Sequence, residues 1–392
     1  MSAIKLLSPT SVNSTNSIAK LVFVLPKLHT GGAERQLLML LRGLSRSKFE
    51  PTVVALSPGG DLADAFTEVA NVYVFPRRYK SDLRPYFCLA KLLREIQPAI
   101  VHGWLWMGNT AAALSVALSA RRVPLLLSVR GLEHVSEIRY KRIIRTLLGR
   151  FAGRKATKVI CNTKTLIEVA IKQYGVGPEN IVIYPNGLHL DYFSDVPSPS
   201  PQDPPTVGII ARLTPVKGHS IFLKALSRTL NIVPDIKAII IGDGPLRLAI
   251  ESEIEQLNLA DRVELVGNAD DIRPYLSRCH FTVLSSLSEG CPNSVIESLA
   301  TGRPVIATRV GGLPELIDDG IDGLLVAPDS SEELANAMIH MASSTSLRHE
   351  MGLHGMQKVR TRFSKHTMVE AYEHLYTSTL ESAAHFDTSG RR

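Results

Sequence analysis

The stretch SEGCPNSVIESLATGRPV, residues 288–305, predicts a loop, a short helix and a strand in immediate succession. Glu289 lies in the loop and Glu297 lies in the helix, which Gly302 and Pro304 bring to an end. The apolar residues that follow are typical of a buried strand. Two carboxylates therefore flank a helix N-terminus, where the backbone itself attracts anions.

The start of this short helix is a candidate anion site. Gly290 precedes it, and Asn293 or Ser294 can cap it, which leaves other first-turn amides for a ligand. Carboxylates beside a phosphate would repel it, unless they bind hydroxyl groups while the amides bind the phosphate. A nucleotide sugar offers both kinds of group. By spacing alone, a surface helix with two solvated glutamates is the better interpretation. The choice between this interpretation and a nucleotide-sugar site therefore depends on the rest of the chain.

Short β-branched runs alternate with helical patterns along the chain, and a segment with five prolines, 195–206, separates two such series. Near-continuous Val and Ile runs indicate strands covered on both faces, as in parallel sheets. The sequence therefore predicts an α/β protein with two doubly wound, Rossmann-like domains facing a cleft. The expected parts are a flexible tail at 1–18, an N-terminal domain at 19–194, a linker at 195–206, a C-terminal domain at 207–362, and a C-terminal helix and tail at 363–392 that packs back on the first domain.

Three motifs fall at the carboxyl ends of predicted strands, where doubly wound domains bind their ligands. Gly31 and Gly32 open a helix after the first strand, either as a phosphate-binding turn or as a tight turn without a ligand. Arg212 and Lys217 follow the first strand of the second domain, where they can neutralise a diphosphate or remain solvated. Gly242 belongs to a second glycine turn, GDG, which lacks the full dinucleotide-binding pattern.

The composition excludes several classes of protein. The chain has 392 residues, 45% of them hydrophobic and 21% charged, as in a globular protein of two domains. Its four cysteines are scattered without metal-type spacing, so we expect a reducing compartment and neither a zinc nor a disulfide framework. The polar N-terminus lacks a secretory pattern, and no apolar run reaches the roughly 20 residues of a membrane span. A cytoplasmic protein is expected.

Charge is unevenly distributed along the chain. Residues 1–200 contain 26 Lys and Arg against 13 Asp and Glu, whereas residues 201–392 contain 18 against 24. The segment 139–158 alone has eight basic residues and no acidic one. Its apolar residues share one helical face, which packs on the sheet if the helix is structural, and the basic face then meets either solvent or an anionic membrane. Nucleic acid is not expected, because no binding motif accompanies the charge. The apolar face comprises Ile143, Ile144, Leu147, Leu148 and Phe151.

Taken together, these motifs resemble the retaining glycosyltransferases of the GT-B fold, specifically glycosyltransferase family 4. The resemblance extends over roughly residues 20–375. No one motif is specific alone, but their combination is. The motifs are the glycine turn at 31–32, PNG at 185–187, RLTPVKG at 212–218, GDGP at 242–245, and SEGCPNSVIE at 288–297 followed by GRPVIATRVGG.

The resemblance implies a role for each matching residue. Arg212 and Lys217 would hold the diphosphate of the donor, and Glu297 would bind its ribose. Glu289 would contact hydroxyl groups of the transferred sugar near its reacting face. The amides of the helix start would add to the phosphate cradle, and Gly32 would approach the donor from the other domain. The expected donor-binding set is Gly31, Gly32, Arg212, Lys217, Gly242, Gly290, Asn293, Ser294 and Glu297.

One departure from the family pattern concerns the reacting centre. Many members have a histidine at the end of the fifth strand of the first domain, and Arg130 stands at the matching place here. His102, at the end of the preceding strand, and His134 are alternatives for handling the acceptor proton, although a lone histidine is more often structural. No D-x-D pair is present, so no metal is expected. The expected catalytic set is Glu289, Arg212, Lys217, His102 and Arg130.

The resemblance implies a metal-independent enzyme of the hexosyl- or N-acetylhexosaminyltransferase class. It would move a sugar from a nucleoside diphosphate sugar, with UDP favoured, to a lipid-linked or cell-surface polysaccharide precursor. Such an enzyme is expected in the cytoplasm, peripherally bound to an anionic membrane surface. Two alternatives remain open: a sugar-nucleotide epimerase on the same two-domain plan, and a non-catalytic module that binds nucleotide sugars.

Overall fold

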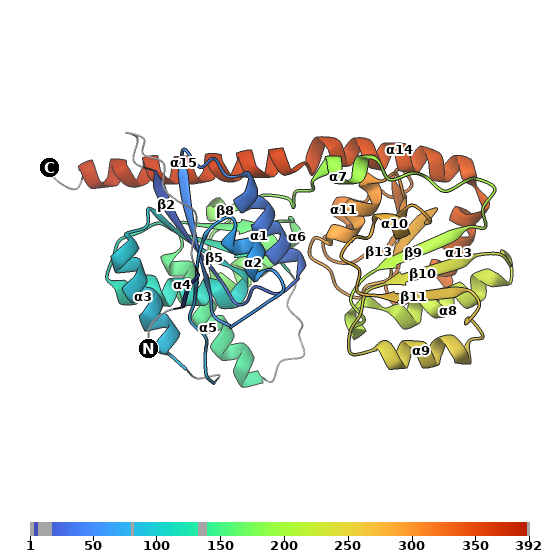
Figure 1. Ribbon diagram of the computed structural model, residues 1–392, viewed down its shortest axis with the longest axis horizontal. Coiled ribbons are helices and arrows are strands. Elements are labelled where there is room, and N and C mark those ends of the chain that lie inside the picture. The colour runs from blue at the N-terminus through green and yellow to red at the C-terminus, as the bar shows by residue number, and fades with distance from the viewer. Residues whose placement is uncertain (1–3, 7–17, 80–81, 132–138, 390–392) are drawn as a thin grey trace. The chain divides into compact units, whose positions relative to one another are not determined.

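Two α/β units make up the chain (Figure 1). The first combines residues up to Gly187 with those from Lys365 onward, and the second runs from Leu188 to Ser364. Each has one sheet with helices on both faces and encloses buried apolar clusters of its own. The expected α/β class with two doubly wound units is therefore confirmed. The residues described by the computed structural model are 4–6, 18–79, 82–131 and 139–389.

One eight-stranded sheet forms the centre of the first unit. Its strands are β1 (Ile4–Leu6), β2 (Ala19–Leu25), β3 (Phe49–Ala55), β4 (Asn71–Val74), β5 (Ile100–Trp104), β6 (Leu125–Val129), β7 (Lys158–Cys161) and β8 (Ile181–Ile183). Their order is β1-β4-β3-β2-β5-β6-β7-β8, and β2 to β8 are parallel to one another. From β2 the chain continues through β3 to β4 on one side of the sheet. It then crosses back to β5, which lies next to β2, and continues through β6 and β7 to β8 on the other side. The direction of winding therefore reverses between β2 and β5.

The side chains of this sheet alternate between two clusters of buried residues. In β2, Leu21 and Phe23 belong to one cluster, and Val22 and Val24 belong to the other. Successive side chains of a strand point to opposite faces, so an uninterrupted apolar strand is buried on both. Helices α1 and α15 cover the first face, and α3, α4 and α6 cover the second. The helices are α1 (Gly32–Gly43), α2 (Ala63–Thr67), α3 (Arg84–Ile96), α4 (Leu105–Ser119), α5 (Arg139–Lys155), α6 (Thr165–Tyr174) and α15 (Lys365–Ser389).

The N-terminal residues differ in part from the loose tail expected over 1–18. Ile4–Leu6 form β1, an edge strand that pairs antiparallel with β4, with Ile4 opposite Val74. An exposed sheet edge presents unpaired amides and carbonyls that another strand can take up. Three residues, Ile4, Lys5 and Leu6, are enough for this pairing, and so short a run is not recognisable as a strand from the sequence.

The second unit has a six-stranded parallel sheet. Its strands are β9 (Thr206–Ile210), β10 (Lys237–Ile241), β11 (Val263–Gly267), β12 (Phe281–Leu284), β13 (Val305–Thr308) and β14 (Gly323–Val326). They lie in the order β11-β10-β9-β12-β13-β14, so the winding reverses between β9 and β12. This is the strand order of dinucleotide-binding folds, whose ligands lie beyond the carboxyl ends of the two central strands.

Helices cover both faces of the second sheet. Phe222 and Met338 pack with Val207 of β9 in one cluster, while Leu299 and Val359 pack with Val305 of β13 in another. The helices are α7 (Leu190–Ser194), α8 (His219–Leu230), α9 (Arg247–Gln256), α10 (Arg273–Leu276), α11 (Asn293–Ala300), α12 (Leu313–Leu316), α13 (Ser331–Ser343) and α14 (Thr345–Arg362).

The boundary between the units differs from the one expected. The division follows Gly187, whereas we expected the first domain to extend to residue 194 and a linker at 195–206. Leu188 and Phe193 are buried in a cluster of the second unit, which accounts for the difference. The guanidinium of Arg303 also donates to backbone carbonyls of the proline-rich segment, so this segment is held against the second unit.

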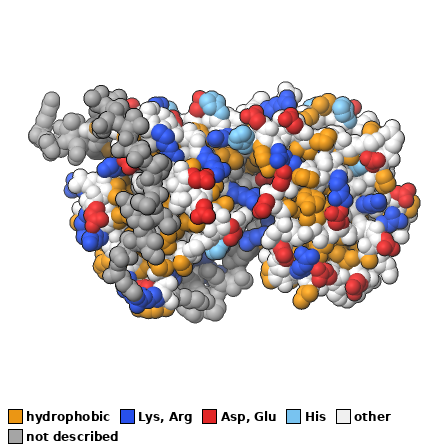
Figure 2. Space-filling view, viewed as in Figure 1, with side chains coloured by type: hydrophobic (Ala, Val, Ile, Leu, Met, Phe, Trp, Pro, Cys, Tyr) orange, Lys and Arg blue, Asp and Glu red, His pale blue; other side chains and the backbone are white. Residues whose placement is uncertain are grey.

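No helix in the described part of the chain is long and apolar enough to cross a membrane. On the face shown in Figure 2, acidic and basic side chains are interspersed over the second unit. This mixture agrees with the near balance of charge in residues 201–392, with 18 Lys and Arg against 24 Asp and Glu. The positive surplus of the chain belongs to its first 200 residues.

Candidate active site

The winding of the second unit reverses between β9 and β12, where doubly wound sheets have a ligand-binding crevice. Strands β9 and β12 are neighbours, but the chain leaves them toward opposite edges of the sheet. Two connections that leave in opposite directions open a space beyond the carboxyl ends of the strands. The loops that follow these strands, 211–218 and 285–292, contain Arg212, Lys217 and Gly290 of the expected donor-binding set, and α11 with Asn293, Ser294 and Glu297 follows the second loop.

Lys217 and Glu289 meet in this crevice. Lys217 Nζ lies 2.5 Å from Glu289 Oε1, and Ser286 Oγ donates to the same oxygen at 2.6 Å. Glu289 is only 8% exposed, and Ser286 is fully buried. Among the described residues, we find no hydrogen bond to the other carboxylate oxygen of Glu289, Oε2. The carboxylate is therefore held through Oε1.

Backbone contacts fix the two loops against each other. Gly218 has a left-handed backbone with φ of 65°, and a Cβ there would lie 2.1 Å from the carbonyl oxygen of Ser285. Ser285 Oγ donates to the carbonyls of Lys217 and Gly218, at 3.1 and 2.9 Å. The amide of Leu287 donates to Val216 at 2.7 Å. Only glycine permits this approach, which brings Lys217 within reach of the loop after β12.

Arg212 follows β9 directly, and its side chain is exposed. The neighbouring turn after β10 contains Gly242, with φ of 141°, where a Cβ would lie 2.1 Å from the carbonyl oxygen of Ala211. Gly242 therefore lets the two turns approach closely. This arrangement leaves the guanidinium of Arg212 accessible at the carboxyl edge of the sheet.

Helix α11 begins differently from the prediction. Its N-cap residue is Pro292, with φ of −70° and ψ of 122°, and no side chain caps it. Asn293 and Ser294 lie inside the first turn, so the expectation that one of them caps the helix is wrong. Proline fits this position because its fixed φ suits the entry to a helix. First-turn amides thus lack a side-chain cap, and half-buried Glu297 lies one turn farther along.

A buried histidine lies beside Lys217. His219 begins α8, is only 2% exposed, and neither ring nitrogen finds a hydrogen-bond partner in the described part of the chain. Burial, followed by the nearby charge of Lys217, lowers the pKa of His219 to about 4. The imidazole is therefore neutral at physiological pH and adds no charge to the crevice.

The first unit has its own reversal point, between β2 and β5. Trp104 ends β5, and its Nε1 donates to the carbonyl of Ala33 at 2.9 Å, which joins β5 to the start of α1. The next residue, Leu105, has φ of 64°, a strained conformation for a side chain of this size. Such backbone strain is concentrated at functional sites, and here it stands at the carboxyl edge of the sheet.

The glycine turn before α1 has less room than expected. Gly31 is the N-cap residue of α1, and a Cβ on it would lie 2.4 Å from Glu34 Oε2. Glu34 is itself buried. The room that the missing Cβ of Gly31 provides is thus filled by a carboxylate. Gly32, the first residue of α1, is therefore a better candidate than Gly31 for contact with a ligand.

His102 lies in the core of the first unit, not in a site. It is 1% exposed, and its Nδ1 and Nε2 lie 3.1 Å from Tyr376 Oη and 2.9 Å from Ser128 Oγ. Burial, followed by the charge of Arg130, lowers the pKa of His102 well below its usual range. Since both ring nitrogens are engaged, this geometry does not support the expected role in handling the acceptor proton. Hydrophobic neighbours on both faces of β5 explain the difference.

Arg130 follows β6 and is almost fully buried. Its guanidinium donates to Asn186 Oδ1 at 3.0 Å and to the hydroxyl of Tyr372, and it stacks over the ring of Trp104 at 4.2 Å. Arg130 Nε has no hydrogen-bond partner in the described part of the chain. Arg130 is thus a fixed positive charge at the carboxyl edge of the first sheet. His134, the other candidate, lies outside the described residues.

The sequence alone did not indicate a role for two residues of these sites, Ser286 and Asn186. Ser286 is the second residue after β12, and this position near the end of a strand is the signal that could have indicated it. Asn186 belongs to the PNG motif but was given no role, and it accepts hydrogen bonds from both Arg130 and Asn162. No group of three potential metal ligands is found among the residues described.

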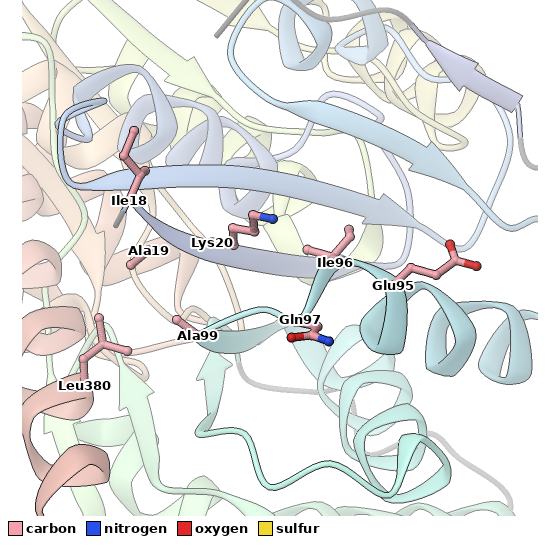
Figure 3. Close-up of a pocket in the computed structure, with 8 residues that line it drawn as sticks. All are labelled: Ile18, Ala19, Lys20, Glu95, Ile96, Gln97, Ala99 and Leu380. Carbon is pink, nitrogen blue, oxygen red and sulfur yellow. The ribbon is translucent and has the colours of Figure 1, made fainter. Parts of the chain in front are cut away.

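A separate cavity of about 470 Å³ lies in the first unit (Figure 3). It is found at the amino ends of the strands, near the first residues of β2 and the end of α3, with Leu380 of α15 on one side. Ligands of doubly wound sheets bind at the opposite edge. Its lining includes one lysine, Lys20, and one carboxylate, Glu95, which do not form a cationic site. We assign no role in the reaction to this cavity.

Comparison with known families matches both units. The profile described as glycosyl transferases group 1 matches residues 204–344, and the profile described as glycosyltransferase family 4 matches residues 30–192. Together the two profiles cover most of the chain. Each contains the glycine turn or the charged loops described above for its unit.

Relatives and solved structures agree with these profiles. The UDP-Gal:alpha-D-GlcNAc-diphosphoundecaprenol alpha-1,3-galactosyltransferase of Escherichia coli is 25% identical over 355 residues, 86% of this chain and 91% of its own. The gpi3 subunit of the phosphatidylinositol N-acetylglucosaminyltransferase of Schizosaccharomyces pombe is 30% identical over 177 residues, 45% of this chain and 39% of its own. Anabaena HepE, solved with UDP and glucose, has a TM-score of 0.78 and 22% identity, over 92% of this chain and 100% of that one. The two profiles, these relatives and the shared fold lead to one conclusion: the chain belongs to glycosyltransferase family 4 and is a glycosyltransferase of the GT-B fold.

Proposed function

We propose that this enzyme moves a hexose or an N-acetylhexosamine from a nucleoside diphosphate sugar, with UDP favoured, to a lipid-linked or cell-surface polysaccharide precursor. We further propose that the transfer retains the configuration of the anomeric carbon. The observation that carries the proposal is the group formed by Lys217, Glu289 and Ser286 at the reversal point of the second sheet.

Positive charge in this crevice suits a diphosphate. Arg212 is exposed there, and Lys217 lies on the same loop after β9. The uncapped first turn of α11 adds backbone amides, which favour anions. During transfer, the bond between the anomeric carbon and the diphosphate oxygen breaks, and negative charge develops on the leaving diphosphate. Arg212 and Lys217 would stabilise that charge, so we propose that no metal ion is required.

The carboxylates suit the hydroxyl groups of the donor. Glu297 lies one turn into α11 and would bind the ribose hydroxyls. Glu289 presents Oε2, which would accept a hydrogen bond from the transferred sugar. Arrival of a diphosphate would compete with Glu289 for Lys217, because both are anions. Ser286 would then keep the carboxylate of Glu289 in place through its hydrogen bond to Oε1.

The names of similar proteins favour this donor and this kind of acceptor. The relative from Escherichia coli is named for UDP-Gal and for a diphosphoundecaprenol acceptor, and the Anabaena structure contains UDP and glucose. A lipid-linked acceptor would place the enzyme peripherally on the cytoplasmic face of a membrane. We propose that location for this chain.

The proposal is tested with radiolabelled UDP-sugars, offered with and without a polyprenyl diphosphate sugar as acceptor, in the presence of EDTA. We expect label to enter the lipid product only when the acceptor is present, with an anomeric configuration, read by NMR, that matches the donor. Conversion of the donor alone to another UDP-sugar would instead identify an epimerase. Tight binding of donors without any turnover would identify a binding module.

A further inference from the structure

Helix α5 turns large apolar side chains outward. Ile143, Ile144 and Leu147 are 54%, 52% and 64% exposed, whereas packing of this face on the sheet was one of the two interpretations of the sequence. Leu148 and Phe151, from the same predicted face, are partly buried. That interpretation is therefore wrong for the first half of the helix, where three neighbouring aliphatic side chains meet solvent. Clustered exposed aliphatic groups usually mark an interaction surface.

Small residues explain the orientation of α5. Gly149 and Gly153 are buried, and a Cβ on them would lie 2.5 Å and 1.9 Å from the carbonyl oxygens of Gln173 and Tyr174 at the end of α6. Ala152, between them, is also buried. These small residues let α5 approach α6 closely, so they form the inward face. The bulky residues at the start of α5 are left on the outer side.

The outward face of α5 is also basic. Arg142, Arg150 and Arg154 are exposed, and α5 contains no aspartate or glutamate. Arg145 differs from them, because its guanidinium stacks on the ring of Trp106, 4.9 Å from the ring centroid, and is partly buried. The exposed surface of α5 therefore combines three aliphatic side chains with three guanidinium groups, and Arg142 lies at its margin because it precedes Gly149 of the inward face by two helical turns. We call these six residues the α5 face.

A second patch of similar composition lies at the start of α3. Leu83 and Phe87 are 59% and 57% exposed, and Arg78 beside them is exposed as well. Helices α3 and α5 both pack against α4. In a parallel sheet each return helix begins at the carboxyl ends of the strands. The starts of both helices, with Ile143, Ile144 and Leu147 on α5 and Leu83 and Phe87 at α3, therefore belong to the edge of the first sheet that also holds Arg130.

We propose that the α5 face docks on an anionic lipid leaflet, with Ile143, Ile144 and Leu147 inserted at the boundary between headgroups and acyl chains. An amphipathic helix with aliphatic residues and flanking Arg residues binds the membrane interface in this way. The guanidinium groups of Arg142, Arg150 and Arg154 would contact lipid phosphates. The inference deepens the proposed function, because it places the acceptor edge of the first sheet beside the surface that carries a lipid-linked acceptor.

Charge complementarity selects the lipid over other occupants. A face without acidic groups cannot form ion pairs with an identical copy of itself, whereas an anionic leaflet offers a negative charge for every guanidinium. The two components of binding also respond differently to salt. The ionic component weakens with screening, and the apolar component does not.

The test measures sedimentation of the purified full chain with liposomes of phosphatidylcholine alone or with phosphatidylglycerol. We expect binding to the anionic vesicles, partial retention at about 0.5 M salt, where the Debye length is roughly 4 Å, and little binding to neutral vesicles. Replacing Arg142, Arg150 and Arg154 by Ser should weaken low-salt binding about 100-fold, roughly fivefold for each residue. Replacing Ile143, Ile144 and Leu147 by Ser should remove the salt-resistant component and weaken binding at least about tenfold.

Matched controls lie in the second unit. Replacing the exposed Lys224, Arg228 and Lys237 by Ser removes the same charge, and Leu248→Ser removes an aliphatic side chain that is 80% exposed. Both controls should bind vesicles like the wild type. Equal binding to neutral and anionic vesicles, or unchanged binding by both α5 variants, would overturn the proposal.

A second copy of the chain is the remaining occupant to test. Dimers seen by sedimentation velocity without vesicles, and abolished by the Ile143, Ile144 and Leu147 variant, would also overturn the proposal. Because vesicle binding requires neither donor nor acceptor, its failure is distinguishable from a failure of the proposed transfer reaction. If the protein binds vesicles but transfers no sugar, the proposed docking surface is supported and the proposed reaction is refuted.

Discussion

Lys217 and Glu289 form an ion pair with 2.5 Å between Nζ and Oε1, and their side chains are only 18% and 9% exposed. Removing one partner of such a pair leaves the other charge buried without compensation, which is strongly destabilising. Lys217 therefore contributes to the stability of the second unit as well as to the binding of its proposed ligand. The side chain of Arg212 is exposed, and no such ion pair is found for it in the described part of the chain.

The first prediction separates these two cations. Arg212→Ala and Lys217→Ala should each lower kcat/KM at least about 10²-fold, which corresponds to roughly 3 kcal/mol of transition-state stabilisation. Only Lys217→Ala should also lower Tm, because it leaves Glu289 unpaired. Adding Glu289→Gln to Lys217→Ala should restore part of the lost Tm. Steady-state kinetics and thermal unfolding measure both effects, and wild-type kinetics in either single variant would refute the assignment to the diphosphate.

The second prediction separates the two glutamates. Glu297→Ala should weaken the binding of free nucleoside diphosphate, because Glu297 is assigned to the ribose. Glu289→Ala should leave that binding nearly intact and lower kcat, because free nucleotide lacks the transferred sugar. Titration calorimetry with UDP distinguishes these outcomes. Equal losses of UDP affinity in both variants would contradict the division of roles.

The third prediction concerns Ser286 as a positioning residue. Ser286→Ala removes one of the two donors to Glu289 Oε1, and a hydrogen bond to a charged group contributes about 1.5–3 kcal/mol. We expect kcat to fall at least about tenfold with little change in the affinity for UDP. Ser288→Ala, in the same loop, serves as the control and should keep wild-type kcat. A fall in UDP affinity without a fall in kcat would argue against positioning.

The fourth prediction concerns the anchoring of α15. Tyr372 is fully buried, and its hydroxyl accepts a hydrogen bond from Arg130. Tyr372→Phe leaves the guanidinium without this partner in a buried place, so the free energy of unfolding should fall by about 1–3 kcal/mol. Chemical denaturation measures the change. Tyr192→Phe, at a residue that is 41% exposed, is the control and should alter stability much less.

The fifth prediction is a pH dependence of stability. The folded-state pKa of His219 is about 4, below the ordinary 6.5, so the unfolded chain binds this proton more readily. Stability from this group is full above about pH 6.5 and falls as pH drops toward 4. Between pH 7 and pH 5, His219→Gln should lose about 2 kcal/mol less of its unfolding free energy than the wild type. His102 and His280, which shift in the same direction, remain in both proteins. Denaturation at both pH values measures this difference, and parallel losses in the two proteins would contradict it.

Much of the fold was predictable from local patterns. Uninterrupted Val and Ile runs separated by helical segments led to two doubly wound sheets, because strand burial on both faces leaves a clear signature. The charged loops after β9 and β12 were predictable for the same reason: strand ends locate ligand sites. Lys217 was predicted from its position at a strand end and Glu289 from the family resemblance, and the structure brings them together.

Other features depend on contacts that no local pattern encodes. The helical period identified an apolar face on α5 but not its direction, which Gly149 and Gly153 determine through their approach to α6. The proline-rich segment had the composition of a linker, yet Arg303 holds it against the second unit from more than a hundred positions away. His102 stood at a strand end in sequence, but the first unit's core encloses it.

The discontinuous first unit has a consequence for synthesis on the ribosome. Residues 188–364 form a continuous unit, whereas the first unit needs Tyr372 and Tyr376 of α15 to complete its core. Domains usually mature in the order of translation. Here the order is inverted: the half that is made first must wait, with one face of its sheet only partly covered by α1 and α2, until α15 has emerged. We therefore expect the nascent N-terminal half to need protection from aggregation.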